Sequence, residues 1–376
     1  MSLKVHQSFL SVSAALILGS FLGCANPSSS TSAPVIAKPD VYVAGTISNS
    51  NMEIATYWKN GVATQLSNLA YGSSANAIAV SGSDVYAAGV QGNGAQDVAV
   101  YWKNGGPVSL TDGTNRGYAN AIVVSNTDVY VAGGEIGLNT TGASYLIAEY
   151  WKNGVPVVLS ARTQSALANS IFISGTDVYV AGSTYQTTQT SSNSYYSTQI
   201  ATLWKNGVPT YLTDGLHYSN AASVFVSGSD VYIAGFAAQT AQATDAAATY
   251  WKNGVPVTLP GSAATSILLN GQDVYVAGYS SQSIPAYWKN GAPTSLVGSI
   301  VTQIAFADGN VYIAGDNYPT FPITSSAAHG ELTGTPIHSE TTGSWLGATY
   351  WENGSAVPLA PNAYSSAANA IAVVTP

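Results

Sequence analysis

The chain has 376 residues, enough for about two average domains, a formal net charge of −8 and a single cysteine. Charged residues make up only 7% of it, far below the roughly one quarter of an ordinary globular protein, and this argues against a helical protein with a charged surface. One cysteine excludes an internal disulfide, so stability has to come from the burial of apolar side chains.

The first residues of the chain are typical of an export signal. Lys4 precedes an apolar run from Phe9 to Gly23, which is short for a membrane span and has the length of a signal-peptide core. The run ends in Phe21-Leu22-Gly23-Cys24, which resembles a bacterial lipobox with Phe21 in the usual place of leucine. We predict a lipoprotein signal peptide over residues 1–23 and lipidation at Cys24. An ordinary cleaved signal is the alternative.

Residues 24–39 are predicted to form a tether, because this stretch is rich in Ser, Thr, Pro and Ala. The repeats described next begin at residue 40 and continue to residue 376. A repeat architecture takes precedence over the expectation from length, so we predict one domain over residues 40–376.

Two short sequence motifs, which we call the first phrase and the second phrase, recur seven times from residue 40 onward. One is typified by Asp-Val-Tyr-Val-Ala-Gly, and the other is Tyr-Trp-Lys-Asn-Gly followed by a Val- and Pro-rich run. The first phrase begins at Asp40, Asp84, Asp128, Asp177, Asp230, Asp273 and Asn310. The second phrase has its tryptophan at Trp58, Trp102, Trp151, Trp204, Trp251, Trp288 and Trp351. Such self-similarity predicts a ring or array of equal units.

Each unit is predicted to be a four-stranded antiparallel sheet. An Asn-Gly pair between β-rich runs indicates a type I′ hairpin, because both turn positions need positive φ. The run after this turn carries proline in most copies, which places it at a sheet edge. Upstream, a small-residue run such as 75–80 turns through Ser81-Gly82-Ser83 into the Asp-Val-Tyr run. Four strands in this meander order form a propeller blade, so the fold class is all-β and the architecture a seven-bladed β-propeller.

The two ends of the repeat region complement each other. The first copy begins at the Asp-Val-Tyr strand without a small-residue strand before it, whereas the chain finishes with a small-residue strand at 369–374. We therefore expect the C-terminal strand to join the N-terminal blade and close the ring.

The Asp of the first phrase and the Lys of the second should pair, because they lie on adjacent strands at one rim. Six units carry both residues, and the seventh has Asn310 with Glu352, which avoids two neighbouring carboxylates. Outside the pairs and the signal peptide, Lys38, Arg116 and Arg162 stand against twelve acidic residues. A nucleic-acid binder needs a basic surface, so we expect no nucleic-acid partner.

The connections on the opposite rim vary in length, and the longest lies between Gly315 and Ala348. Variable loops on a rigid frame are where binding residues gather. This loop repeats a His-x-Glu pattern in His329/Glu331 and His338/Glu340. Residues i and i+2 of an extended chain point the same way, so each pair could present an imidazole and a carboxylate to one divalent cation. Solvated loop residues are the alternative, because this spacing alone is not a metal signature.

Four aromatic residues on the same rim are candidate ligand-binding residues: Trp345, Tyr195, Tyr196 and Tyr218. The seven repeated tryptophans are instead predicted to pack between neighbouring sheets. Asp112 and Asp214 begin Asp-Gly segments that lack the continuation of a calcium loop, so we interpret both as turns.

Residues 40–376, with their repeating Trp-Lys-Asn-Gly hairpins, resemble bacterial envelope β-propeller lipoproteins, which implies the fold and an envelope location. The chain lacks the WD40, kelch and sialidase signatures and a Gly-x-Ser-x-Gly nucleophile elbow. We predict a non-catalytic, lipid-anchored binding or protein-interaction module without a cofactor, whose partner is an envelope protein or a glycan. The alternative is a carbohydrate-active hydrolase or lyase that uses Glu331, Glu340 and Asp316 of the long loop.

Overall fold

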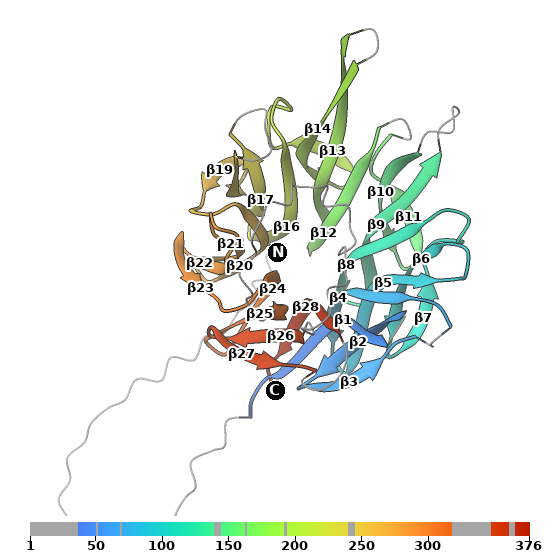
Figure 1. Cartoon of the computed structure of the whole chain (residues 1–376), viewed down its shortest axis with the longest axis vertical. Coiled ribbons are helices and arrows are strands. Elements are labelled where there is room, and N and C mark those ends of the chain that lie inside the picture. The colour runs from blue at the N-terminus through green and yellow to red at the C-terminus, as the bar shows by residue number, and fades with distance from the viewer. Residues whose placement is uncertain are drawn as a thin grey trace, which may run out of the picture. The chain divides into compact units, whose positions relative to one another are not determined.

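The computed structural model describes residues 37–49, 52–67, 70–138, 144–161, 164–191, 194–239, 245–317, 347–360 and 365–376. The regular elements of these ranges are β-strands, numbered β1 to β28 along the chain (Figure 1). In this part of the chain there is no helix that is long and apolar enough to span a membrane.

The strands form seven four-stranded antiparallel sheets, the blades, which follow one another around a ring (Figure 1). Blade 1 contains β28 (Ser366–Val374), β1 (Asp40–Asn49), β2 (Met52–Lys59) and β3 (Val62–Gln65). Blade 2 contains β4 (Ser73–Ser81), β5 (Asp84–Gly92), β6 (Asp97–Lys103) and β7 (Gly106–Ser109). Blade 3 contains β8 (Gly117–Ser125), β9 (Asp128–Leu138), β10 (Ser144–Lys152) and β11 (Val155–Val158).

The remaining blades have the same strand order. Blade 4 contains β12 (Ala166–Ser174), β13 (Asp177–Ser191), β14 (Ser194–Lys205) and β15 (Val208–Tyr211). Blade 5 contains β16 (Ser219–Ser227), β17 (Asp230–Ala238), β18 (Ala246–Lys252) and β19 (Val255–Thr258). Blade 6 contains β20 (Ala263–Asn270), β21 (Asp273–Tyr279), β22 (Pro285–Lys289) and β23 (Ala292–Ser295). Blade 7 contains β24 (Ile300–Ala307), β25 (Asn310–Asn317), β26 (Gly347–Glu352) and β27 (Ser355–Pro358).

The meander order predicted from the repeats is confirmed. The small-residue strand of each blade lies at the centre of the ring, and the Pro-bearing strand lies on the outside (Figure 1). Each outer strand has four residues, and most of their side chains are exposed. The outer strands therefore form the perimeter of the ring and contribute little to the core.

The Asn-Gly pairs adopt the predicted turn. Asn60 has a φ of 50° and Gly61 a φ of 82°, and the other six pairs have nearly the same values. Asn60 also works through its side chain, because its Oδ1 accepts a hydrogen bond of 2.9 Å from the backbone N–H of Val41. The turn residue therefore supports the left-handed backbone and also binds the start of the neighbouring strand.

The core lies between blades, and the repeated tryptophans fill it as predicted. Trp58, for example, packs with Ala314, Ala348 and Leu359 of blade 7, and it is 1% exposed. The strands come so close at the centre that a Cβ on Gly45 would lie 1.7 Å from the backbone oxygen of Ala367. The glycine of the first phrase is thus required by the approach of two backbones.

The ring closes as predicted. The C-terminal strand β28 pairs antiparallel with β1, and its partners run from Asp40↔Val374 to Ile47↔Ser366. Blade 1 therefore combines the beginning and the end of the repeat region in one sheet.

Candidate functional site

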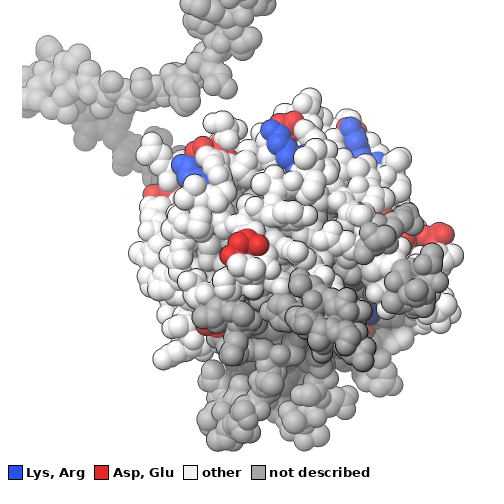
Figure 2. Space-filling model, turned by 90° about the horizontal axis from the view of Figure 1, so that it is seen from above, with Lys and Arg blue, Asp and Glu red and all other residues white. Residues whose placement is uncertain are grey.

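The blades present two rims of different character. The lysine rim carries the Asn-Gly turns and six Asp–Lys pairs with Nζ–Oδ2 distances of 2.7–3.0 Å. The pairs are Asp40–Lys59, Asp84–Lys103, Asp128–Lys152, Asp177–Lys205, Asp230–Lys252 and Asp273–Lys289. Figure 2 shows Lys in blue beside Asp in red along the upper edge of the view. The predicted pairing is confirmed.

The lysine of each pair lies over a tyrosine ring. The Nζ of Lys59 lies 5.1 Å from the centre of the Tyr42 ring, which is within the range of a cation–π interaction. The hydrogen bond from Lys59 and a second one from Asn60 hold the pKa of Asp40 below its usual value. Such exposed pairs mainly determine strand register, since a surface ion pair contributes little free energy.

Blade 7 replaces the pair as the sequence predicts. Asn353 donates a hydrogen bond of 2.8 Å to the Oδ1 of Asn310, and the hydroxyl of Tyr312 donates to the Oε1 of Glu352 at 3.4 Å. The changed residues keep the same hydrogen-bonded corner without bringing two carboxylates together.

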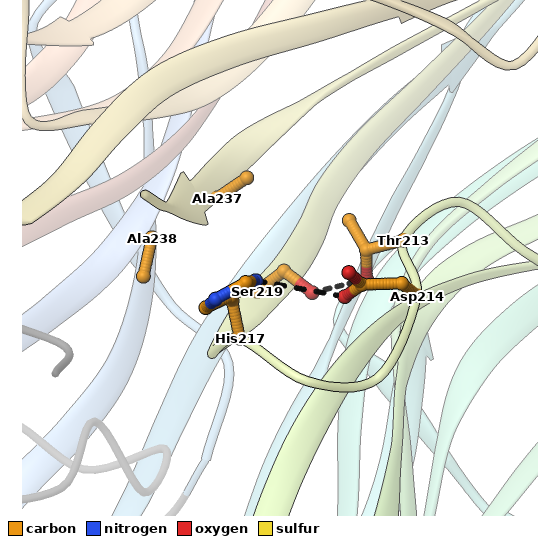
Figure 3. A pocket seen from close by; sticks show the side chains of 6 residues that line it. All are labelled: Thr213, Asp214, His217, Ser219, Ala237 and Ala238. Atoms are coloured by element: carbon orange, nitrogen blue, oxygen red, sulfur yellow. Dashed lines mark hydrogen bonds and ion pairs between the residues drawn. The ribbon is translucent and has the colours of Figure 1, made fainter. Parts of the chain in front are cut away.

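The loop rim lies at the other end of the blades. It consists of the connections between the second and third strands of each blade and between the last strand of one blade and the first of the next. A cavity of about 250 Å³ opens on this rim between blades 4 and 5 (Figure 3). It is lined by Thr213, Asp214, His217, Ser219, Ala237 and Ala238, and we call it the His217 pocket.

Two side chains at the His217 pocket are available to a ligand. The Oδ1 of Asp214 accepts a hydrogen bond of 2.9 Å from the N–H of Leu216 and lies 3.7 Å from the Nδ1 of His217. The side chains of Asp214 and His217 are 56% and 36% exposed, so both can still exchange hydrogen bonds with a bound molecule. Ala237 and Ala238, at the end of β17, complete the lining (Figure 3).

Ser219 has a structural role in the same pocket. It is fully buried, and its hydroxyl accepts a hydrogen bond of 3.0 Å from the N–H of Ala201 and lies 2.7 Å from the hydroxyl of Thr213. Ser73 and Ser366, at the same position in other blades, accept equivalent bonds from Ala55 and Ala348. Ser219 therefore holds a strand in place and is not positioned as a nucleophile.

The pocket depends on the turn predicted at Asp214, although the sequence did not indicate a site there. Gly215 has a φ of 76°, and the equivalent Gly113 in blade 2 has a φ of 77°. Asp112 accepts a hydrogen bond of 2.9 Å from the N–H of Thr114, as Asp214 does from Leu216. Residues 111–113 and 213–215 share the sequence Thr-Asp-Gly. A shared loop conformation could have been predicted from this repetition.

Of the predicted aromatic residues, Tyr218 lies beside the His217 pocket in the chain. Its ring stacks on Phe236, with centroids 6.2 Å apart and an interplanar angle of 14°. Tyr195 and Tyr196 belong to β14 and pair with Gln189 and Thr188 in the longest hairpin of the ring. Trp345 lies outside the described residues.

The predicted metal-binding residues His329, Glu331, His338 and Glu340 also lie outside the described residues, as does Cys24. The described ranges contain no group of three or more His, Cys, Asp or Glu residues that could hold a metal ion. The proposed divalent-cation site thus stays a prediction.

Asp316 requires a correction. We expected it in the long loop, but it lies inside β25, where it pairs with Ala348 and is only 5% exposed. Its Oδ1 accepts a hydrogen bond of 2.8 Å from the N–H of Ala368, and burial raises its pKa to about 7. The strand continues past the Gly of the repeat because β24 and β26 both extend far enough to pair with it.

The strand topology defines the chain as a seven-bladed β-propeller. No protein-family model matches the sequence, and no curated protein matches it. Among solved structures, the one described as "Structure of YjhT" shares 11% identity, covers 64% of this chain and 89% of its own, and has a TM-score of 0.37. This distant likeness carries no argument about function.

Proposed function

We propose that the protein is a non-catalytic binding or protein-interaction module that holds its partner on the loop rim. The observation that supports this most directly is the His217 pocket, where a carboxylate, an imidazole and the alanine-lined end of β17 surround one cavity. Ligand sites commonly combine an apolar lining with a few convergent polar groups. The lysine rim instead repeats one paired cluster, so it offers a ligand little that is distinctive.

The partner is proposed to be an envelope protein or a glycan. Two predictions from the sequence support this choice: lipidation at Cys24, and the resemblance to propeller lipoproteins of the bacterial envelope. A lipid on Cys24 would anchor the propeller to a membrane through residues 24–39. The acidic balance of the chain supports a neutral or basic partner over a nucleic acid.

The enzyme alternative has one observation in its favour. The pKa of about 7 for Asp316 suits a general acid or base at neutral pH. A glycosidase, however, needs two carboxylates that both reach the glycosidic bond. Asp316 is 5% exposed and already accepts a backbone hydrogen bond, which favours the binding module.

The proposal can be tested with glycan arrays and with pull-downs from envelope extracts. The double variant Asp214→Asn/His217→Ala keeps a hydrogen-bond acceptor for Leu216 but removes the exposed charge and the imidazole. We expect at least tenfold weaker binding, about 1.4 kcal/mol. Asp112→Asn is the matched control, because it makes the equivalent change in the blade 2 turn, and it should bind as the wild type does.

A second variant locates the site within the rim. Replacing residues 318–344 with a short Gly/Ser linker tests the predicted contribution of the long loop, since shortening a surface loop changes closure entropy little. Loss of binding in this variant alone would place the site in the loop and not in the His217 pocket. Full binding by both variants would contradict the proposal, and turnover of a glycan by the wild type would support the enzyme alternative.

A further inference from the structure

Asp316 places a carboxyl group inside the seam that closes the ring. The seam lies between blade 7 and β28, the C-terminal strand of blade 1. The hydrogen bond from the N–H of Ala368 to the Oδ1 of Asp316 crosses this seam at 2.8 Å. Near it, the seam is packed with small apolar side chains, including Ala314, Ala348 and Ala368, all of them fully buried.

Among the seven copies of the first phrase, only the one in blade 7 has a carboxyl group directly after the glycine. Asp316 follows the glycine of the first phrase, and the equivalent residues in blades 1 to 6 are Thr46, Val90, Gly134, Ser183, Phe236 and Tyr279. At the preceding seam, between blades 6 and 7, the hydroxyl of Tyr279 accepts a hydrogen bond of 3.1 Å from the N–H of Val301. Val301 and Ala368 occupy the same position in their strands. At adjacent seams, a neutral hydroxyl and an ionisable carboxyl group therefore accept equivalent backbone hydrogen bonds.

The surroundings of Asp316 offer no compensating positive charge in the described strands. β24 and β28 contain no titratable residue, and β21 contributes Tyr279, whose pKa rises mainly through burial. β26 contributes Tyr350 and Glu352, and Glu352 lies at the lysine-rim end of that strand. A carboxylate in such a place is costly because it has lost its water without gaining a counter-charge.

We propose that Asp316 makes the closure of the ring pH-sensitive: the protonated carboxyl group keeps β28 firmly packed against blade 7, and ionisation weakens this packing. Burial raises the pKa of Asp316 from 3.8 to about 7. In the folded state the group therefore changes charge around neutral pH. The contribution of Asp316 to the stability of the closed ring is fully favourable below pH 3.8, and this contribution becomes less favourable as the pH rises towards 7.

Amide hydrogen exchange of the whole propeller tests this proposal. Protection factors for β28 at pH 5 and pH 8 report how often the closing seam opens, after correction for the intrinsic exchange rate. We expect protection of the Ala368 amide to fall at least tenfold between the two pH values. The Val301 amide at the adjacent seam, bonded to the hydroxyl of Tyr279, is the internal control and should change much less.

The variant Asp316→Asn keeps an acceptor for Ala368 and removes the charge, so protection of its β28 should be nearly the same at both pH values. A wild-type protein whose β28 is equally protected at pH 5 and pH 8 would overturn the proposal. The same holds if β28 of the Asp316→Asn variant loses protection at pH 8 as the wild type does. If this variant does not fold, NMR titration of the Asp316 carboxyl carbon in the wild type decides the matter. A midpoint near 3.8, the ordinary value, would contradict the proposal.

Discussion

The side-chain amide of Asn153 donates a hydrogen bond of 2.8 Å to the carboxylate of Asp128, which begins the neighbouring strand 25 residues earlier. The other oxygen of this carboxylate, Oδ2, lies 2.8 Å from the Nζ of Lys152. The Oδ1 of Asn153 accepts the N–H of Val129 at 2.8 Å. One turn residue thus attaches the hairpin to the start of the strand beside it.

This arrangement predicts that the asparagine contributes more than its backbone conformation. Asn153→Gly keeps a residue that tolerates positive φ but removes both side-chain bonds, so the free energy of unfolding should fall by about 1 kcal/mol. Asn353→Gly is the matched control, because its partner is the neutral Asn310 and hydrogen bonds to charged groups are stronger. Urea unfolding of both variants at pH 7 measures the difference. Equal losses would show that the carboxylate adds nothing.

Asp316→Asn should stabilise the protein near and above neutral pH. The folded pKa of about 7 lies above the ordinary 3.8, so ionisation opposes folding in this interval and above it. At about 1.4 kcal/mol per pH unit, the gain for the variant is at most about 4 kcal/mol above pH 7 and close to zero below pH 4. Thermal unfolding between pH 4 and 8 measures the gap.

Tyr279→Phe supplies the comparison for that experiment. It removes the neutral acceptor of the adjacent seam, so it should lower the thermal midpoint by a similar amount at every pH in this range. If the difference in thermal midpoint between the wild type and Asp316→Asn does not change with pH, the carboxyl group titrates normally in the folded protein.

Removal of residues 366–376 should abolish cooperative unfolding. The deletion takes away β28, exposes the inner edge of β1 and removes Ile371, which is 3% exposed. Burial of one such aliphatic side chain contributes about 1.5 to 3 kcal/mol, and the strand buries several apolar residues. Deletion of Thr375 and Pro376 alone, which lie beyond β28, is the control. An unchanged unfolding midpoint in the longer deletion would show that blade 1 is stable without β28.

Cys24→Ala should release the protein from membranes, because Cys24 is the only thiol and follows the predicted export signal. Fractionation of cells that express either form, followed by a high-salt wash, measures the attachment. A variant that stays in the washed membranes would place the anchor elsewhere in the chain.

The sequence predicted the features that short-range chemistry determines. Motifs of about six residues recur once in each blade. They predict the Asn-Gly turns, the four strands of each blade, the Asp–Lys pairs and the closing strand. Type I′ turns need two residues with positive φ, and an alternating or apolar run beside them is sufficient to define the hairpin. Comparison of the seven copies then revealed the coordinated change at Asn310 and Glu352.

The site residues could not be predicted in the same way. The His217 pocket exists because the turn at 213–217 lies against the end of β17, and nothing in the local sequence states that contact. Asp316 looked like a loop residue because the repeat phrase ends one residue earlier, at Gly315. Its burial depends on β24, which pairs with it within blade 7, and on β28, which packs beside it only when the ring is closed.

The prolines of the outer strands have one further consequence. Pro156 faces Trp151, one pair beyond the Lys152↔Val155 pair that flanks the turn, and Pro107, Pro209, Pro256 and Pro293 occupy the same place. In a two-residue hairpin the pair beside the turn is hydrogen-bonded, so the next residue of the outer strand directs its backbone nitrogen away from the sheet. Proline at that position costs no hydrogen bond within the blade and removes a donor that another chain could use to add a strand. In five of the seven blades, proline therefore disfavours the addition of a strand from another chain at the perimeter of the ring.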